Sequence, residues 1–407
     1  MLELKNFVPE ITVIGGCGHV GLPLSVLFAS RGKKVCALDI NKELINKVNN
    51  GIIPFIDEDL DKHLLKALNN NCFLATDDPI CIKESNIIII IIGTPVDEHL
   101  NPKVYELKNV INKYLSYFKS GQLIVLRSTV YPGTTELIYA MFKGNNLDVD
   151  VSFCPERIAQ GFSVKELVEL PQIISSFSEN GIKRAKELFN ILTNDIVVLK
   201  PIEAELAKLF TNTWRYINFA ISNQFYMIAN DYGVDFYKIY HAMTHNYPRT
   251  KNFPRAGFAA GPCLFKDTMQ LASFYKNNFF LGHAAMLINE GLPNYIVDKI
   301  KSKHNLKESS VGILGLTFKA DNDDIRESLS FKLKKLLELE AKKVYCSDYY
   351  LKEKNLKNFD NLVSEEELIN NSDIIIIATP HKKYKNLDYK NKKVYDIWNF
   401  LEKGGII

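Results

Sequence analysis

Ser85–Pro95 reads SNIIIIIIGTP, and Ser372–Pro380 reads SDIIIIATP. Each segment is an unbroken run of isoleucines that ends in a turn. Uninterrupted β-branched runs of this length are typical of strands that are buried on both faces of a parallel sheet. The similarity continues upstream in two further pairs of short apolar segments: Val13–Gly16 with Val311–Gly315, and Val35–Asp39 with Val344–Asp348. The repeat predicts two α/β domains, each built on a doubly wound parallel sheet.

The composition is that of an ordinary globular protein. Of the 407 residues, 46% are hydrophobic and 24% are charged, and the net charge is +3. This balance provides no broad electric field for nucleic acid or a membrane surface. The first residues lack the pattern of a secretory signal, and the longest apolar run is too short to span a bilayer. Seven cysteines without a Cys-x-x-Cys pair argue against a disulfide framework, so we expect a cytoplasmic protein.

The apolar pattern changes from strand to helix at about residue 200. Pro201 suits the first turn of a helix whose apolar residues recur at helical spacing to about Asp231. A second long helix is predicted over residues 281–303, and a loop rich in proline and glycine, Asn246–Pro262, lies between the two. The pattern therefore predicts three domains: an N-terminal α/β domain over 1–199, a central helical domain over 200–304, and a C-terminal α/β domain over 305–407.

Gly16–Gly21 reads GCGHVG, which is the Gly-x-Gly-x-x-Gly pattern of a dinucleotide-binding loop. The loop follows a predicted strand and opens a predicted helix, so its backbone N–H groups would face a pyrophosphate. Asp39 ends the second strand, 18 residues after Gly21, where a carboxylate binds ribose hydroxyls and repels a 2′-phosphate. The alternative is a tight turn without a ligand, but strand, glycines, helix and acid all agree. The sequence therefore predicts that NAD binds, in preference to NADP.

The corresponding loop of the second α/β domain lacks this fingerprint. Gly315–Lys319 reads GLTFK and contains one glycine where the first loop has three. Two interpretations stay open. The loop binds a different nucleotide, with Lys319 as a phosphate or base contact, or it is a structural repeat without a ligand.

Gly261–Asp267, which reads GPCLFKD, combines a nucleophile with a carboxylate. Pro262 can begin a helix, and Cys263 would then lie in its first turn, where the helix dipole stabilises a thiolate. Asp267 falls four residues later and hence on the same face. This spacing favours an acid–base arrangement around a nucleophile. The alternative is a buried, inert cysteine.

Two further pairs of polar residues lie at helical spacing. Lys208 and Asn212 are surrounded by apolar residues on the Pro201 helix, and a cation and an amide on one face can hold an oxyanion together. The alternative is a solvated surface pair. His241 and His245 are also four residues apart, but no glutamate lies between them, so we expect no metal site.

These motifs occur together in one known family. The chain resembles the UDP-glucose/GDP-mannose dehydrogenase family of nucleotide-sugar 6-dehydrogenases over essentially its whole length. The matching segments stand in the family's order: Gly16–Pro23, Gly93–Pro95, Ser128–Val130, Pro132–Thr135, Cys154–Arg157, Glu205–Asn212, Gly261–Asp267, Phe318–Lys319 and Asp323–Ser328. The resemblance implies two Rossmann-like doubly wound domains, one for NAD and one for the UDP-sugar, joined by a long central helical dimerisation segment. It also implies a homodimer or a higher oligomer.

The resemblance assigns roles to individual residues. The implied catalytic residues are Cys263 as nucleophile, Lys208 and Asn212 as oxyanion donors, Asp267 and Thr129 as residues that position or activate water, and Glu156 as an acid–base or water-holding group. The implied cofactor contacts are Gly16, Gly18, His19, Val20, Gly21, Asp39, Thr94, Pro95, Thr129 and Arg326. The implied substrate contacts are Glu156, Arg157, Ile158, Lys208, Phe258, Gly261, Phe318, Lys319 and Arg249, the last of which the family passes across the dimer.

The family resemblance also implies a four-electron reaction. Removal of one hydride from a primary alcohol leaves an aldehyde, to which the Cys263 thiolate adds. The resulting thiohemiacetal gives up a second hydride, and the thioester that forms is hydrolysed. One turnover yields two NADH and a UDP-uronic acid, and no metal is needed. A two-electron dehydrogenase of similar architecture would need no cysteine.

The motifs point to two different branches of the family and hence to two different sugars. Cys154–Arg157 looks like the N-acetylhexosamine branch of the family, and Gln160 stands where the glucose-type enzymes carry a glutamate. The Cys-x-x-Lys-Asp pattern that begins at Cys263 looks like the glucose and mannose branches. We expect UDP-glucose as substrate, with UDP-N-acetylmannosamine or UDP-N-acetylglucosamine as the alternative. The alternative outside the enzymes is that the chain is a catalytically silent NAD-binding structural protein.

Overall fold

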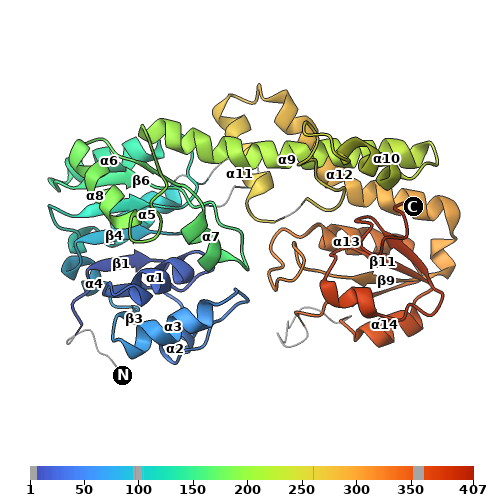
Figure 1. Cartoon of the computed structure of the whole chain (residues 1–407), viewed down its shortest axis with the longest axis horizontal. Coiled ribbons are helices and arrows are strands. Elements are labelled where there is room, and N and C mark those ends of the chain that lie inside the picture. Colours follow the sequence, from blue (N-terminus) through green and yellow to red (C-terminus); the bar gives the residue numbers. More distant parts are fainter. Residues whose placement is uncertain (1–6, 95–96, 98–102, 104, 260, 352–361) are drawn as a thin grey trace. The chain divides into compact units, whose positions relative to one another are not determined.

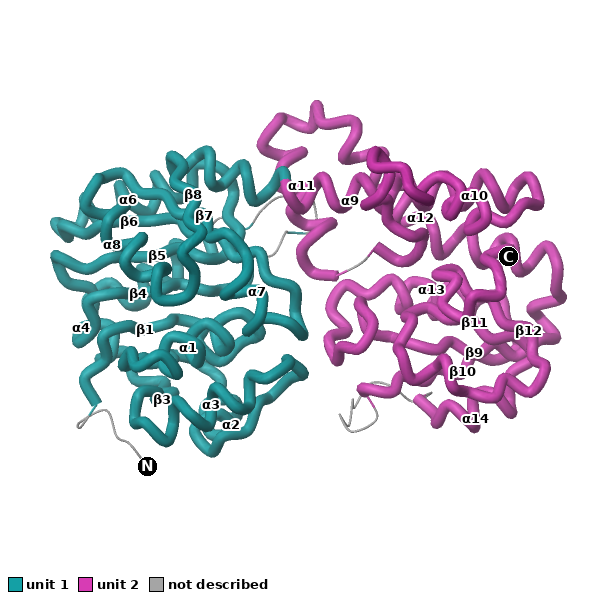
Figure 2. Tube along the Cα trace, in the orientation of Figure 1, with its two compact units in different colours: residues 1–210 teal, residues 211–407 magenta. Residues whose placement is uncertain are grey.

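The computed structural model describes residues 7–94, 97, 103, 105–259, 261–351 and 362–407. They form two compact units, Met1–Phe210 and Thr211–Ile407 (Figure 2). The units divide inside a long helix, and the three domain boundaries proposed from the sequence remain predictions. Within the described ranges, no helix is both long and apolar enough to cross a membrane.

The first unit is built on a parallel sheet with the strand order β3-β2-β1-β4-β5-β6 (Figure 1). The strands are β1 (Ile11–Ile14), β2 (Val35–Leu38), β3 (Phe73–Thr76), β4 (Ile87–Ile90), β5 (Leu123–Leu126) and β6 (Asp150–Phe153). Successive isoleucines of β4 point to opposite faces: Ile89 packs into one apolar layer, and Ile88 and Ile90 pack into the other. Because both layers are buried, the strand is apolar at every position.

Helices cover this sheet and connect its strands. They are α1 (Gly21–Ser30), α2 (Lys42–Asn49), α3 (Leu60–Asn69), α4 (Ile80–Glu84), α5 (Tyr105–Lys113), α6 (Thr134–Gly144), α7 (Ser163–Glu169) and α8 (Glu179–Phe189), with a 3₁₀ turn at Leu115–Tyr117. All residues of α1 are buried, because this helix packs against α3 and α7 as well as β2. A separate two-stranded parallel sheet pairs β7 (Gln172–Ser175) with β8 (Ile196–Leu199).

The long helix α9 spans Pro201–Asp231, which are the bounds predicted from the sequence. Gly233 follows it with a φ of +67°, and its N–H donates to the carbonyl oxygen of Asn230. A glycine in the left-handed region ends helices in this way. The predicted start and stop signals of α9 are therefore confirmed.

The second unit contains a smaller parallel sheet and the remaining helices. Its sheet has the order β10-β9-β11-β12, with β9 (Ser310–Leu314), β10 (Lys343–Ser347), β11 (Ile374–Ile377) and β12 (Lys393–Asp396). Its helices are α10 (Phe236–Thr244), α11 (Leu264–Phe274), α12 (Phe280–Lys303), α13 (Leu329–Glu340) and α14 (Glu365–Asn371), with 3₁₀ turns at Leu306–Glu308 and Lys382–Asn386.

The two sheets explain the repeat in the sequence. β2, β1 and β4 are consecutive neighbours in the first sheet, and β10, β9 and β11 are consecutive neighbours in the second. These are the strands that carry the repeated segments, in corresponding positions. The predicted fold of two Rossmann-like doubly wound domains with a long central helix is confirmed.

Candidate active site

The fingerprint loop joins β1 to α1 and is shaped by its glycines. A Cβ on Gly16 would lie 2.7 Å from the Cβ of Ala37, and one on Gly21 would lie 2.1 Å from the carbonyl oxygen of Gly15. A Cβ on Gly18 would approach one atom, at 3.7 Å. The first and third glycines are thus required by packing, whereas the second leaves an exposed stretch of backbone that a pyrophosphate can approach.

Asp39 follows β2 and lies beside this loop. It is half-buried, and its Oδ2 accepts the N–H of Cys17 at 3.1 Å. Val20 precedes the first turn of α1, and the ring of His19 lies 4.3 Å from the ring of Phe55. A carboxylate at the ribose position and an open loop backbone fit an NAD molecule, whose nicotinamide would supply a hydride acceptor.

The predicted threonines meet at the carboxyl ends of β4 and β5. The Oγ1 of Thr94 donates to the carbonyl oxygen of Thr129 at 2.7 Å. The Oγ of Ser128 accepts the N–H of Ile92 at 2.8 Å and donates to its carbonyl oxygen at 2.7 Å. Parallel sheets bind ligands at this edge. Pro95, which was also predicted to contact the cofactor, lies outside the described residues.

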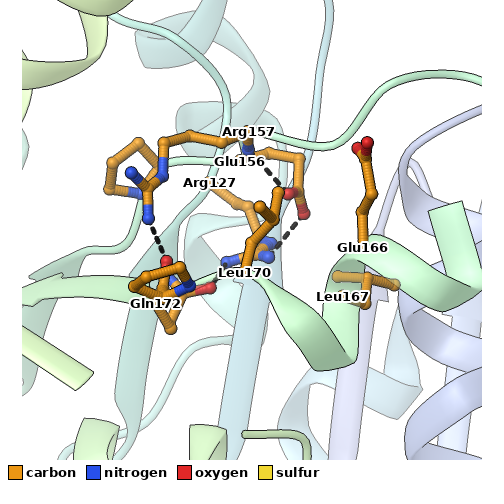
Figure 3. Close-up of a pocket in the computed structure, with 9 residues that line it drawn as sticks. Arg127, Glu156, Arg157, Glu166, Leu167, Leu170 and Gln172 are labelled. Atoms are coloured by element: carbon orange, nitrogen blue, oxygen red, sulfur yellow. Dashed lines mark hydrogen bonds and ion pairs between the residues drawn. The ribbon is translucent and has the colours of Figure 1, made fainter. Parts of the chain in front are cut away.

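Glu156 follows β6 at the same edge of the sheet. Its Oε1 accepts the N–H of Arg157 at 2.7 Å, and its Oε2 accepts from Arg127 (Figure 3). Oε1 also accepts the N–H of Ile158 at 3.0 Å. The predicted substrate residues Arg157 and Ile158 thus hold this carboxylate through their backbone. Arg127 and its neighbour Gln172 are not among the predicted site residues, although an arginine directly after a buried strand is a signal for this edge.

Cys263 is exposed and occupies the N-cap position of α11. The prediction that it lies in the first helical turn is wrong by one residue, because the helix begins at Leu264. Its carbonyl oxygen accepts the N–H of Asp267 at 2.9 Å, which confirms the one-turn spacing. The alternative of a buried, inert thiol is wrong, because the Cys263 side chain is reachable from solvent.

Asp267 is fully buried and contacts α9. Its Oδ2 accepts the Nδ2–H of Asn212 at 2.6 Å, and the Nζ of Lys266 lies 3.5 Å from its Oδ1. Lys208 and Asn212 are 8% and 4% exposed, so the alternative of a solvated surface pair is wrong. The structure brings Asn212 and Asp267 together, a contact that the sequence did not indicate.

Gly261 and Arg326 lie near the cysteine in the second unit. Gly261 has a φ of +106°, and a Cβ there would lie 2.6 Å from the ring of Phe318. The Nε of Arg326 donates to both carboxylate oxygens of Asp324, at 2.9 and 3.0 Å. This hydrogen bonding raises the pKa of Arg326 above its usual range, and the charge of Cys263 acts in the same direction.

The loop after β9 also has a carboxylate beside it, at the position that corresponds to Asp39. Asp348 is fully buried, and its Oδ2 accepts the N–H groups of Leu316 at 2.6 Å and Thr317 at 3.1 Å. The Nε2 of His381 lies 3.1 Å from the same oxygen. The carboxylate of Asp348 thus holds two amides of this loop, as the carboxylate of Asp39 holds the N–H of Cys17 in the first loop. The two loops differ in their glycines, one against three, and Lys319 lies half-buried beside the second loop.

The last two predicted substrate residues differ in exposure. Phe258 is buried at 4% exposure. Arg249 is exposed, and its Nη1 lies 3.3 Å from the hydroxyl of Tyr247. An exposed arginine on a loop is available to a ligand or to another chain.

Three models of the UDP-glucose/GDP-mannose dehydrogenase family match the chain. The NAD binding domain matches residues 9–193, the central domain matches residues 202–290, and the UDP binding domain matches residues 312–403. They cover both units and confirm that the chain carries an NAD-binding and a UDP-binding domain.

Individual relatives agree with this assignment. The chain is 31% identical to the UDP-N-acetyl-D-mannosamine dehydrogenase of Pyrococcus horikoshii, over 92% of this chain and 90% of that protein. It is 29% identical to the enzyme of the same name from Methanocaldococcus jannaschii, over 98% of this chain and 94% of that protein. The solved structure of the Pyrococcus horikoshii UDP-D-ManNAc dehydrogenase superimposes with a TM-score of 0.88, covering 97% of each chain at 29% identity. The chain belongs to the UDP-glucose/GDP-mannose dehydrogenase family of NAD-dependent nucleotide-sugar dehydrogenases.

Proposed function

We propose that the chain is a UDP-N-acetylhexosamine 6-dehydrogenase, with UDP-N-acetyl-D-mannosamine as the first candidate substrate. The observation that carries this proposal is the similarity to UDP-N-acetyl-D-mannosamine dehydrogenases over nearly the whole chain. The sequence of Cys154–Arg157 supports the same branch of the family. These two observations favour the N-acetylhexosamine alternative over UDP-glucose, which the sequence analysis preferred.

The proposed chemistry uses Cys263 as a covalent nucleophile. When bound, NAD accepts a hydride from the C6 carbon of the sugar at each of two oxidation stages. Between these stages the Cys263 thiolate adds to the aldehyde carbon, and a carbon–sulfur bond forms. After the second oxidation the carbon is a thioester, and water displaces the thiolate to give the carboxylic acid. The exposure of Cys263 and its place at a helix N-terminus support this role.

Asn212 and Asp267 are proposed to act together on the tetrahedral stages. The amide of Asn212 has two N–H donors, and one of them donates to Asp267. That bond orients the amide plane, so the second N–H can be directed at a developing oxyanion. Lys208, four residues earlier on α9, is proposed to add a positive charge for the same oxyanion. Thr129 and Glu156 are proposed to hold the water that completes the reaction.

We also propose a homodimer that pairs through α9. Five of its exposed apolar residues lie at intervals of four, seven, four and three residues, which places them on one helical stripe: Phe210, Trp214, Ile221, Phe225 and Ile228. Exposed apolar residues of this extent are typical of an interface between chains. Arg249 is proposed to reach the site of the partner chain. The cytoplasmic location remains a prediction.

A panel of nucleotide sugars tests the proposed function directly. NADH release is measured by absorbance with UDP-N-acetylmannosamine, UDP-N-acetylglucosamine, UDP-N-acetylgalactosamine, UDP-glucose and GDP-mannose. We expect the highest kcat/KM with an N-acetylated UDP-sugar, and two NADH per sugar consumed. A preference for UDP-glucose would return the assignment to the glucose branch, and one NADH with free aldehyde as product would indicate a two-electron enzyme.

A further inference from the structure

Arg127 carries a buried charge at the carboxyl edge of the first sheet. It directly follows β5, and Glu156 follows the neighbouring strand β6. The side chain of Arg127 is 1% exposed, and its Nη2 donates to Oε2 of Glu156 (Figure 3). Its Nη1 donates to two neutral groups, the carbonyl oxygen of Cys154 at 3.0 Å and Oε1 of Gln172 at 2.9 Å. Among these three hydrogen-bond partners of the guanidinium, Glu156 is the one that carries a negative charge.

The surroundings of Arg127 restrict the orientation of its guanidinium. The ring of Phe189 lies 4.8 Å from the guanidinium carbon, and Gln172 is itself held by a bond from its Nε2 to the carbonyl oxygen of Ile173. Burying an ion pair is often no better for stability than packing apolar side chains in the same space. A contribution to stability therefore does not explain why the Arg127 guanidinium is buried in a pair with Glu156.

Within the described residues, the hydrogen bonds to Glu156 leave one of its acceptor positions unused. A carboxylate has about four acceptor positions, two on each oxygen. Oε1 accepts two backbone N–H groups, and Oε2 accepts one N–H from Arg127. The remaining position is on Oε2, the oxygen that Arg127 orients. The pair also borders a cavity of about 10 Å³, which is room for a single water.

We propose that Arg127 is a positioning residue that acts through Glu156 in the hydrolytic half of the reaction. The inference rests on the proposed function, because it assigns the step to the Cys263 thioester. In that step the water oxygen forms a bond to the carbonyl carbon, the carbon–sulfur bond breaks, and the thiolate leaves. The proton that the water loses passes toward Oε2 of Glu156 and from there to solvent. By its hydrogen bond to Oε2, Arg127 fixes the direction from which this oxygen can accept the hydrogen of the water.

Rapid-mixing measurements of NADH with the best substrate of the panel can isolate this step. In Arg127→Met we expect a burst of two NADH per active site, because both oxidations precede hydrolysis. The steady state that follows should be slower than wild type by on the order of 100-fold, the effect of misplacing a reacting group by about 1 Å. Glu156→Gln should behave in the same way, and the acyl-enzyme should accumulate in both variants by intact-protein mass. Arg127→Lys should recover part of the rate.

A double variant and a matched control separate positioning from folding. Arg127→Met in the Glu156→Gln background should lower kcat no further, because Arg127 acts through that carboxylate. Arg184→Met is the control, since Arg184 pairs with Asp150 at the opposite end of the same strand, β6. It should leave kcat and the burst unchanged. If Arg127→Met does not fold, Gln172→Met removes a neutral partner of Arg127 and should give the same burst with a smaller loss of rate.

The possible outcomes are distinguishable. Wild-type turnover in Arg127→Met, a burst that shrinks in proportion to kcat, or independent effects of the two substitutions in the double variant would each overturn the positioning role. Cys263→Ala tests the proposed function on its own. Full turnover in Cys263→Ala would remove the thioester, and with it both the proposed function and the step assigned to Arg127. An inactive Cys263→Ala with an unaffected Arg127→Met would leave the function in place and reject Arg127 alone.

Discussion

At the scale of the residue, the chemistry depends on how each group is presented. Cys263 is exposed at a helix N-cap, whereas the neighbouring carboxylate of Asp267 is fully buried and fixed by Asn212. An exposed thiol beside a fixed polar pair suits the proposed covalent catalysis, because the nucleophile must reach the substrate while the pair is already in place. Single substitutions can therefore separate catalysis from binding.

Replacing the nucleophile should abolish turnover and leave cofactor binding intact. We expect Cys263→Ala to release no NADH above background and to bind NAD with an unchanged Kd by calorimetry, since the fingerprint loop belongs to the first unit. Cys263→Ser should accumulate an ester adduct, because an alkoxide leaves less readily than a thiolate. Cys72→Ala is a suitable control, since Cys72 is a half-buried thiol in the first unit. Substantial turnover by Cys263→Ala would disprove covalent catalysis.

Asp39 should determine the preference between NAD and NADP. A carboxylate close to a 2′-phosphate costs about 1 kcal/mol or more, so we expect kcat/KM for NAD to exceed that for NADP by at least about fivefold. Asp39→Asn should narrow this ratio. Asp77→Asn is the matched control, because Asp77 directly follows the neighbouring strand β3 and is exposed. Equal use of the two cofactors by the wild-type protein would mean that Asp39 does not contact the ribose.

At the scale of the element, α9 has two apolar faces, of which one is buried and the other is exposed. One face is buried within the chain and carries Tyr216, Ala220 and Tyr226. The opposite stripe includes Trp214, which is 61% exposed, and Phe210, which is 53% exposed. The chain itself therefore covers one of the two apolar faces. The N-terminal part of α9 is fixed by Glu205, whose carboxylate caps α6.

Removing that cap should destabilise the first unit. Glu205 is 1% exposed, and it accepts the N–H of Gly133 at 2.6 Å and that of Thr135 at 2.8 Å. In Glu205→Ala these buried N–H groups lose their acceptor, which should cost about 1–3 kcal/mol. Urea unfolding followed by circular dichroism measures the loss. Glu203→Ala, which removes an exposed carboxylate of the same helix, should have a much smaller effect, and equal losses in both variants would contradict the capping role.

At the scale of the whole molecule, the exposed stripe of α9 predicts an obligate homodimer. Light scattering at assay concentration should give twice the mass of the chain. Trp214→Glu should produce monomers and lower the activity, because it places a charge in the proposed interface. An active wild-type monomer would disprove the interface.

The dimer also makes a prediction about shared sites. If Arg249 acts in the partner's site, Arg249→Ala and Cys263→Ala should each be inactive alone. Mixing the two variants should form hybrid dimers in which one site has both groups, so up to about a quarter of the wild-type activity should return for random pairing of equal amounts. No recovery after verified subunit exchange would indicate that Arg249 acts within its own chain.

Local sequence was sufficient for the architecture and for the principal candidate residues. The isoleucine runs identify strands buried on both faces, because alternating side chains of one strand must fill two apolar layers. The glycines of the fingerprint loop identify a turn that a Cβ would block, and Pro201 and Gly233 mark the ends of α9. Each of these signals depends on backbone geometry or periodicity within a few residues, so it can be recognised before the chain is folded.

Tertiary structure alone decided which polar groups face one another. Arg127 and Glu156 are 29 residues apart, and Asn212 and Asp267 are 55 residues apart. Asp348 follows β10, and the loop amides that it accepts follow the neighbouring strand β9. No local pattern encodes these contacts, because hydrogen-bond partners depend on strand order and helix packing. The sequence determined the fold and identified the candidate nucleophile, whereas the folded chain determined how the carboxylates are oriented.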